Sequence, residues 1–190
     1  MARNRHETWQ AMGATLKKTV VMVGMMGAGK TAVGMELARM LGVPFVDSDA
    51  EIERAAARTV AEIFARDGEA FFRLKEAQVI ARLLGAAPGV LSVGGGAYLN
   101  PATRALIAGK GVAVWLKADQ DLLWSRVKRR DTRPLLRTAD PYGTLGALMA
   151  AREPAYAEAD LVVEARPEFS IEATAGRVRE ALATRPDVLG

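Results

Sequence analysis

Short apolar runs alternate along this chain with longer segments in which apolar residues recur every three or four positions. The short runs are rich in β-branched side chains, which is typical of buried strands. They lie at 19–23, 45–47, 90–93, 112–116 and 161–164. The longer segments predict amphipathic helices. These lie at about 30–41, 49–56, 59–66, 69–84, 101–108, 119–129, 142–158 and 170–183.

This alternation predicts an α/β fold. Strands joined through helices run parallel, and the helices cover both faces of the sheet. We therefore expect a three-layer sandwich around a five-stranded parallel sheet. Ligands of such sheets bind beyond the carboxyl ends of the strands. Candidate site residues should thus follow directly after a strand, or lie in an insertion that reaches over that edge.

A phosphate-binding motif follows the first strand. The eight residues Gly24–Thr31, GMMGAGKT, fit the pattern G-x-x-x-x-G-K-[ST]. Because the motif lies where a strand leads into a helix, its backbone N–H groups and the helix N-terminus form an anion site. Lys30 can reach the β- and γ-phosphates of a nucleotide, and the Thr31 hydroxyl can bind Mg²⁺. The alternative, an ordinary glycine-rich turn, is disfavoured by both flanks.

Two aspartates end the second strand, in Asp47-Ser48-Asp49. Both carboxylates should project over the same edge as the phosphate loop, so one can face a metal and the other a second substrate. Helix capping is the alternative, because Ser48 and Glu51 have capping-box spacing, and both interpretations can hold. The third strand ends in glycine rather than in the acidic residue that often helps to hold Mg²⁺. The metal carboxylate should therefore be Asp47.

Three successive glycines, Gly94–Gly96, follow the third strand. Glycine loses more conformational freedom on folding than any other residue, so three in a row favour close approach of the backbone to a ligand over a simple turn. Arg73 and Arg152 are candidates for binding a carboxylate through their planar guanidinium groups. Each also fits a surface ion pair, as Arg73 does with Glu76 three positions on. Spacing does not show whether the two arginines converge.

The strongest concentration of charge lies at 126–137, RVKRRDTRPLLR. Pro134 prevents a helix from continuing through it. A basic flap that closes over bound phosphates would place an arginine on the transferred phosphoryl group. A solvated helix end is the alternative. A nucleic-acid surface is disfavoured, because no aromatic residues interrupt the run.

Composition narrows the class of protein further. The 190 residues are half apolar and one quarter charged, as expected of one globular domain. The chain has no cysteine, which excludes disulfides, thiolate metal sites and cysteine nucleophiles and suits a reducing cytoplasm. The net charge of +4 suits anionic ligands but is weak support for nucleic-acid binding. We expect no membrane span, a mobile leader at 1–18 with the only histidine, His6, solvated in it, and a single domain at 19–185.

Together these motifs resemble those of shikimate kinases, in order, over nearly all of 19–183. The family patterns are G-x-M-G-[SA]-G-K-[ST], D-x-D, I-F-x-x-x-G-E-x-x-F-R-x-x-E, G-G-G-A, R-P-L-L and R-x-x-x-Y. They match the chain at 24–31, 47–49, 63–76, 94–97, 133–136 and 152–156. The resemblance implies a phosphate-loop fold like that of nucleoside-monophosphate kinases.

The resemblance also implies the reaction and its residues. It implies Mg²⁺-dependent transfer of the ATP γ-phosphoryl group to the 3-hydroxyl of shikimate, in the cytoplasm, for the synthesis of chorismate and aromatic amino acids. The implied catalytic residues are Lys30, Asp49 and Arg133. The implied ATP-binding residues are Gly27, Ala28, Gly29, Lys30, Thr31, Ala32, Arg129, Arg130 and Arg133. The implied shikimate-binding residues are Asp49, Arg73, Gly94, Gly95, Gly96 and Arg152, and those for Mg²⁺ are Thr31 and Asp47.

Further expectations concern the regions that should move on binding and the residues that should support the pocket. The resemblance implies a shikimate-binding region at about 49–76, a lid at about 126–138, and a pocket supported by Phe64, Phe72 and Glu76. An arginine of 126–130 should stack on adenine, and we favour Arg129 or Arg130. The partners should be ATP and shikimate, with neither nucleic acid nor membrane, and the enzyme should be a monomer.

Two other functions remain as alternatives. A kinase of another small hydroxy acid, such as gluconate, would share the phosphate loop but would not need Arg73, Gly94–Gly96 and Arg152 together. A nucleotide-dependent switch would need nucleotide-sensing loops and a partner surface, and the sequence marks neither.

Overall fold

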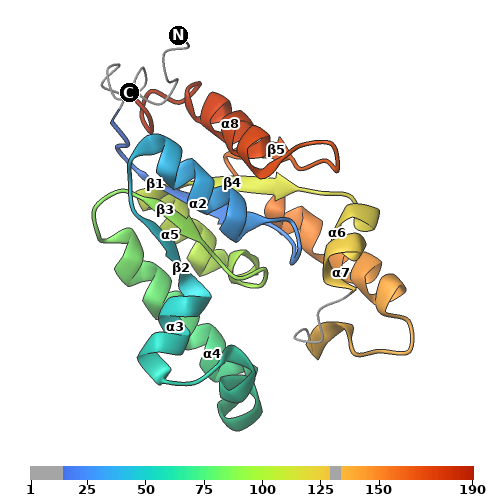
Figure 1. Ribbon diagram of the computed structural model, residues 1–190. Coiled ribbons are helices and arrows are strands. Elements are labelled where there is room, and N and C mark those ends of the chain that lie inside the picture. The colour runs from blue at the N-terminus through green and yellow to red at the C-terminus, as the bar shows by residue number, and fades with distance from the viewer. Residues whose placement is uncertain (1–14, 129–133) are drawn as a thin grey trace.

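A computed structural model gives the structure of the protein and describes residues 15–128 and 134–190. Its centre is a parallel sheet with the strand order β2-β3-β1-β4-β5 (Figure 1). The strands are β1 (Thr19–Val23), β2 (Phe45–Asp47), β3 (Val90–Ser92), β4 (Gly111–Lys117) and β5 (Leu161–Glu164). The predicted α/β class and five-stranded parallel sheet are confirmed.

The helices lie close to the predicted ranges. They are α2 (Lys30–Leu41), α3 (Ser48–Ala56), α4 (Val60–Leu84), α5 (Pro101–Lys110), α6 (Gln120–Val127), α7 (Pro141–Tyr156) and α8 (Ile171–Leu182), with short 3₁₀ helices η1 (Ala97–Leu99) and η2 (Pro134–Leu136). Helix α4 contains the two helices expected at 59–66 and 69–84, which meet at a kink at Gly68. The φ of +82° at Gly68 is not helical, and glycine adopts it without strain.

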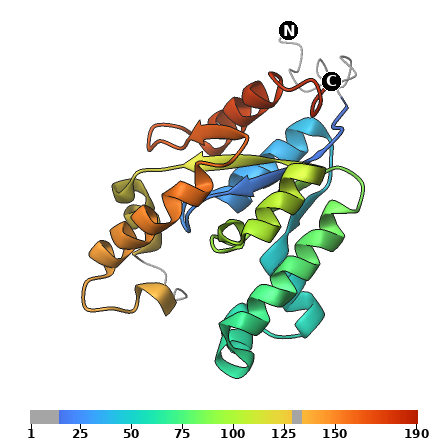
Figure 2. The ribbon, with the colours of Figure 1, turned by 180° about the vertical axis from the view of Figure 1, so that it is seen from behind.

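Helices cover both faces of the sheet, as the three-layer prediction requires. Helices α2 and α8 pack side by side on one face (Figure 1), and α4, α5 and α7 lie on the other (Figure 2). The central strands are therefore buried on both sides: every residue of β1 is buried, and so is all of β4 except Lys117. Such strands are continuously apolar rather than alternating, which is why they are easily recognised in the sequence.

The order of the strands determines where a ligand can bind. β1 lies between β3 and β4, and the chain goes from β1 to β2, at one edge of the sheet, before it returns to β3. The loop after β1 is therefore at the switch point of the sheet, where the crevice of an open α/β fold forms. The register aligns Asp47 with Ser92, and Ser92 with Met22 of β1. The ends of three strands thus meet at one level beside the phosphate loop.

The two ends of the described chain pair with each other. Leu16 forms an antiparallel bridge with Leu189, and the backbones of Thr15 and Gly190 are hydrogen-bonded to each other. The Leu16 side chain is 7% exposed and belongs to the main core. Residues 15–18 and 186–190 therefore contact the fold, outside the expected boundaries at 19 and 185. Spacing could not show this, because the bridge joins segments at opposite ends of the sequence.

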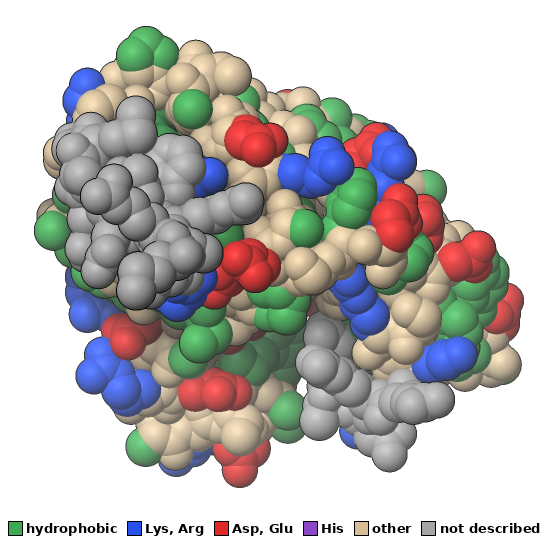
Figure 3. Space-filling model, turned by 45° about the horizontal axis from the view of Figure 1, so that its top comes forward, with side chains coloured by type: hydrophobic (Ala, Val, Ile, Leu, Met, Phe, Trp, Pro, Cys, Tyr) green, Lys and Arg blue, Asp and Glu red, His purple; other side chains and the backbone are tan. Residues whose placement is uncertain are grey.

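The surface carries both signs of charge. On the face drawn in Figure 3, outside the grey residues, acidic and basic side chains are interspersed rather than gathered into one block. Within the described ranges, no helix combines the length and the apolar character needed to cross a lipid bilayer.

The pairing of the chain ends leads to a stability prediction. Leu16→Ala should lower the free energy of unfolding by about 2–5 kcal/mol, because it removes buried methyl groups and leaves a cavity. Leu74→Ala is the matched control, since Leu74 is 56% exposed, and it should change the free energy by less than ~0.5 kcal/mol. Urea denaturation followed by circular dichroism measures both. Equal effects of the two substitutions would show that residue 16 does not belong to the core.

Candidate active site

The phosphate loop turns on glycines that no other residue could replace without strain. Gly24, Gly27 and Gly29 have φ values of +135°, +80° and +98°. A side-chain carbon at Gly24 would lie 2.7 Å from the carbonyl oxygen of Leu116. Gly29 precedes the first turn of α2 without a capping side chain. The first N–H groups of α2 therefore face the loop, where an anion can accept their hydrogen bonds.

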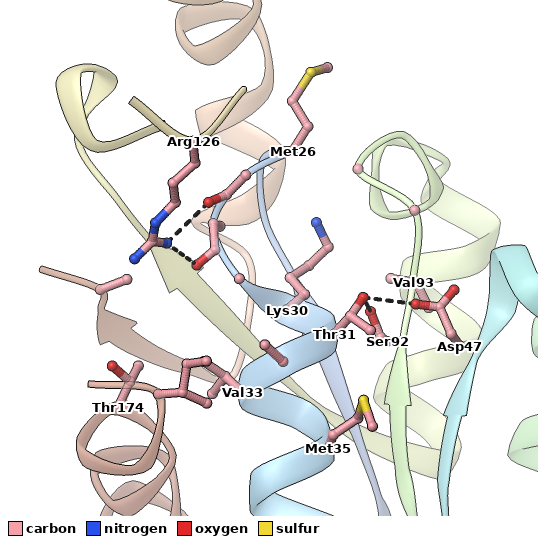
Figure 4. Close-up of a pocket in the computed structure, with 18 of the residues that line it drawn as sticks. Met26, Lys30, Thr31, Val33, Met35, Asp47, Ser92, Val93, Arg126 and Thr174 are labelled. Carbon is pink, nitrogen blue, oxygen red and sulfur yellow. Dashed lines mark hydrogen bonds between the residues drawn. The ribbon is translucent and has the colours of Figure 1, made fainter. Parts of the chain in front are cut away.

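Lys30 and Thr31 begin α2 and lie at the centre of this loop. The Lys30 ammonium donates hydrogen bonds to the carbonyl oxygens of Gly24, at 2.9 Å, and Met25, at 3.0 Å. The Thr31 hydroxyl donates to Oδ2 of Asp47 at 2.9 Å (Figure 4). A cation and a hydroxyl thus lie on adjacent residues at the start of α2, and the hydroxyl is bonded to a carboxylate at the end of β2.

Asp47 links the phosphate loop to the next helix. Its Oδ1 accepts hydrogen bonds from the backbone N–H groups of Asp49, at 3.0 Å, and Ala50, at 3.4 Å, so Asp47 is the N-cap of α3. The capping box at Ser48 and Glu51, which is the alternative interpretation of this motif, does not form, because the cap is one residue earlier. Ser48 already lies inside the first turn, where its buried hydroxyl has no hydrogen-bond partner among the described residues. The Glu51 carboxylate instead pairs with two arginines, Arg54 and Arg82.

Two buried carboxyl oxygens meet beside the first of the three glycines. A side-chain carbon at Gly94 would lie 3.1 Å from Oδ1 of Asp49 and 3.0 Å from Oε1 of Glu76. Neither oxygen accepts a hydrogen bond within the described part of the chain. Burial raises the pKa of Asp49, and nearby Asp47 raises it further while Lys30 opposes the change. Burial likewise raises the pKa of Glu76, against the influence of Arg73. Hydroxyl groups of a ligand would satisfy such acceptors.

The other two glycines face the predicted arginines. A side-chain carbon at Gly96 would lie 2.6 Å from Cζ of Arg73, and one at Gly95 would lie 3.3 Å from Nη1 of Arg152. The structure thus brings α4 and α7 together over one glycine segment, a convergence that spacing alone could not establish. The Arg73 guanidinium donates to Oε2 of Glu76 at 2.8 Å and also lies 3.3 Å from Oε1 of Glu69.

Arg152 differs from Arg73 in its surroundings. It is only 8% exposed, and no carboxylate of the described residues lies within 4.0 Å of its guanidinium. A buried cation without a counter-ion is unfavourable in the absence of a ligand. The position therefore favours an anion, and the planar guanidinium suits a carboxylate.

A cavity of about 650 Å³ joins the loop to α8 and to the glycine segment. It is lined by Met26, Gly27, Ala28, Gly29, Lys30, Thr31, Ala32, Val33, Met35, Asp47, Asp49, Ser92, Val93, Gly94, Gly95, Arg126, Ala165, Phe169, Ile171 and Thr174. The predicted phosphate-binding residues 27–32, both aspartates and two of the three glycines therefore border one space. We did not predict the wall that follows β5, although the rule that ligands bind after strand ends would have found it.

Arg126 is the described arginine of the basic segment that borders this cavity. Its Nη1 donates to the carbonyl oxygens of Gly27, at 3.1 Å, and Ala28, at 3.0 Å (Figure 4). Arg129, Arg130 and Arg133 lie outside the described residues. Our preference for Arg129 or Arg130 thus stays a prediction, and Arg126 is the member of the predicted set 126–130 that borders the cavity.

Comparisons with known proteins identify the family. The family model described as shikimate kinase matches residues 26–183. A shikimate kinase of Cereibacter sphaeroides is 66% identical over 186 residues, which are 98% of this chain and 92% of that relative. The chain belongs to the shikimate kinase family. As a member of this family it is an ATP-dependent small-molecule kinase.

Solved structures agree with this assignment. A shikimate kinase of Acinetobacter baumannii in complex with shikimate has a TM-score of 0.85 and 34% identity, and covers 94% of this chain and 97% of its own. A gluconokinase of Sinorhizobium meliloti has a TM-score of 0.56 and 22% identity, and covers 89% of this chain and 96% of its own. The second likeness shows a shared fold alone.

The raised pKa of Asp49 predicts a cost to the stability of this kinase. Above its pKa, the buried carboxylate is ionised in the folded state at the expense of stability, so the free energy of unfolding should fall as pH rises through that pKa. Asp49→Asn should therefore be more stable than the parent at pH 7, and the gap should close at acidic pH. Urea denaturation between pH 4 and pH 7 measures the gap.

The control substitution should change the free energy of unfolding in the opposite direction. Hydrogen bonds from Arg54 and Arg82 lower the pKa of Glu51, so Glu51→Gln should be less stable than the parent at pH 7. An Asp49→Asn variant that is less stable than the parent at pH 7 would contradict the raised pKa of the Asp49 carboxyl.

Proposed function

We propose that this site transfers the γ-phosphoryl group of ATP to the 3-hydroxyl of shikimate, giving ADP and shikimate 3-phosphate for aromatic amino acid synthesis. The observation that carries the proposal is the convergence of two arginines and two buried carboxyl oxygens on Gly94–Gly96, beside the phosphate loop. An acceptor that bears a carboxylate and several hydroxyl groups complements this set. The shikimate bound in the Acinetobacter baumannii structure supports the choice of acceptor.

The acceptor carboxylate binds to the arginines in this proposal. Arg152 supplies a buried cation, and Arg73 is oriented by Oε2 of Glu76, 2.8 Å from its Nη1. The hydroxyl groups bind to Asp49 and to the free Oε1 of Glu76. The glycines provide the space, because a side chain at Gly96 would collide with Arg73 and one at Gly94 or Gly95 would crowd the other groups that hold the acceptor.

The donor occupies the other end of the cavity. The phosphates bind to the N–H groups of 27–32 and to Lys30, which exchanges the carbonyl oxygens of Gly24 and Met25 for charged phosphate oxygens. The base lies toward Arg126 and the wall formed by Ala165 and Phe169. The role of Arg133 over the transferred group remains a prediction from the motif.

Transfer itself relies on positioning and electrostatics. The acceptor oxygen forms a bond to phosphorus on one side while the bond to the leaving oxygen of ADP breaks on the other. Asp49 orients the acceptor hydroxyl and takes its proton. The raised pKa of Asp49 makes this carboxylate a better base than an exposed aspartate. Lys30 stabilises the charge that spreads over the equatorial phosphoryl oxygens.

Magnesium fits Thr31 and Asp47. A hydroxyl and a carboxylate are hard oxygen ligands, and a hydrogen bond of 2.9 Å already holds them together. The described residues offer no cluster of three His, Cys, Asp or Glu side chains. Mg²⁺ needs none, because it keeps several waters and uses one or two protein ligands with substrate phosphates. When bound, it neutralises charge on the β- and γ-phosphates. A monomeric state and a cytoplasmic location remain predictions.

The first experiment tests the acceptor. ADP formation from ATP and Mg²⁺ should require shikimate, and equal concentrations of gluconate should give less than about one hundredth of that rate, because gluconate lacks the ring that spaces its groups. Turnover without any acceptor, or faster turnover with gluconate, would reject the proposal. Asp49→Asn is the control for the site: it should lose at least about a hundredfold in kcat while ATP binding, measured by calorimetry, persists.

A second experiment tests the carboxylate role of Arg152. Arg152→Ala should raise the KM for shikimate at least about tenfold, because it removes a charge-assisted hydrogen bond, while the KM for ATP stays within about twofold. Arg152→Lys keeps the charge without the bidentate geometry and should fall between the two. Arg54→Ala is the matched control, because Arg54 is an exposed arginine outside the cavity. Equal changes in the KM values of both substrates would contradict the role.

A further inference from the structure

Tyr156 is a fully buried residue that the proposed mechanism does not use. It ends α7, with 0% of its surface exposed. Its hydroxyl donates a hydrogen bond of 2.6 Å to the carbonyl oxygen of Gly95 and lies 3.8 Å from Sδ of Met25 in the phosphate loop. One phenol therefore contacts both the donor loop and the glycine segment.

Gly95 is the point at which three segments meet. A side-chain carbon at this position would lie 3.3 Å from Nη1 of Arg152, 3.5 Å from the carbonyl oxygen of Gly24 and 3.6 Å from the hydroxyl of Tyr156. Because a peptide unit is planar, fixing the Gly95 carbonyl also fixes the direction of the next N–H group, that of Gly96. The hydroxyl therefore controls the backbone on which both predicted arginines converge.

Tyr156 also lies beside Arg152. The two residues are four positions apart on α7, so their side chains lie on one face of the helix. Burial raises the pKa of Tyr156, and the nearby Arg152 guanidinium opposes that change. The phenol consequently stays protonated near neutral pH, and its proton is committed to the Gly95 carbonyl. A phenol oxygen keeps its lone pairs when it donates its proton, so it can also accept from a neighbouring guanidinium.

We propose that Tyr156 is a positioning residue for acceptor recognition, whose hydroxyl holds both the Gly95 peptide and the Arg152 guanidinium in place. The inference rests on the proposed role of Arg152 in binding the acceptor carboxylate. Tyr156 touches neither substrate in this assignment. It acts through its neighbours, since small displacements of groups that orient a substrate weaken binding.

The ring and the hydroxyl of Tyr156 have separable roles. The ring packs against Trp115, with centroids 5.9 Å apart, and both side chains belong to the main core. Tyr156→Phe keeps that packing and removes only the hydroxyl. It should raise the KM for shikimate about tenfold, which is ~1.4 kcal/mol, while kcat and the KM for ATP stay within about twofold.

Tyr98→Phe is the matched control. Tyr98 is a buried tyrosine, 4% exposed, on the 3₁₀ helix η1 that follows the glycine segment. Its hydroxyl donates to the carbonyl oxygen of Glu158 at 3.4 Å, so the substitution removes a tyrosine hydrogen bond to a carbonyl outside the glycine segment. Tyr98→Phe should leave the KM for shikimate unchanged. Thermal denaturation of both variants records any general loss of stability.

A double variant tests the route through Arg152. Arg152→Ala combined with Tyr156→Phe should raise the KM for shikimate by less than the product of the two single effects, because the part of the Tyr156 effect that acts through the Arg152 guanidinium is already lost. An unchanged KM for shikimate in Tyr156→Phe would overturn the inference. So would additive effects in the double variant, or an equal effect of Tyr98→Phe.

The outcomes also separate this inference from the proposed function. If Arg152→Ala itself leaves the KM for shikimate unchanged, the carboxylate role of Arg152 fails and the inference fails with it. If Arg152→Ala raises that KM and Tyr156→Phe does not, only the positioning role of Tyr156 is rejected.

Discussion

The backbone of Gly94–Gly96 passes between four charged side chains and has none of its own. Asp49 and Glu76 approach the first glycine, Arg152 the second and Arg73 the third. These groups come from three helices, and they can surround the segment only because a Cβ atom is absent at each step. A methyl group at Gly96 would collide with the Arg73 guanidinium, and one at Gly94 or Gly95 would press against the neighbouring charged groups and shift them. The acceptor half of the site therefore depends on a steric constraint before it depends on any attraction.

The site also depends on the parallel sheet, which brings the phosphate loop and the glycine segment to the same edge. β1, β2 and β3 end side by side, so the phosphate loop, Asp47 and the glycine segment start from neighbouring strand ends. Asp47 then uses both of its oxygens. One caps α3, which carries Asp49, and the other accepts from Thr31 in the donor loop. A single carboxylate thus links α3, which carries Asp49, to the phosphate-loop residue Thr31.

The sequence predicts most of the fold because its signals are local. The apolar strands, the helical periodicity and the loop Gly24–Thr31 each lie within a few consecutive residues. The errors concern contacts between distant segments, as in the pairing of Leu16 with Leu189 at the two ends of the chain. The cap of α3 was misassigned by one residue, because Asp47 and Ser48 are both good capping residues and only the backbone geometry distinguishes them.

Site residues show the same division between local and distant signals. Arg73 and Arg152 are recognisable as motif residues, but α4 and α7 lie far apart in sequence, and only packing brings them to one glycine segment. Arg126 and Phe169 border the cavity without a strong motif. Tyr156 was visible as the end of a motif, yet its hydrogen bond to Gly95 depends on how α7 packs against that loop. Sequence patterns identify which chemistry is available, and packing decides which groups share a substrate.

Without ligands, the site contains buried charged and polar groups whose pairing within the described residues is incomplete. The kinds of partner they need indicate the chemistry of the acceptor. Arg152 is a buried cation without a carboxylate partner among the described residues. Asp49 and Glu76 each keep a buried oxygen that accepts no hydrogen bond there, and burial raises the pKa of both groups. Folding tolerates these unfavourable terms because the main core, around β1 and β4, is large and apolar. An acceptor that brings one carboxylate and several hydroxyl groups removes all three deficits at once. The binding energy gained when the acceptor pairs with these groups can be used to orient its hydroxyl toward the phosphate loop. The incompletely paired groups of the site therefore favour an acceptor that can satisfy all of them.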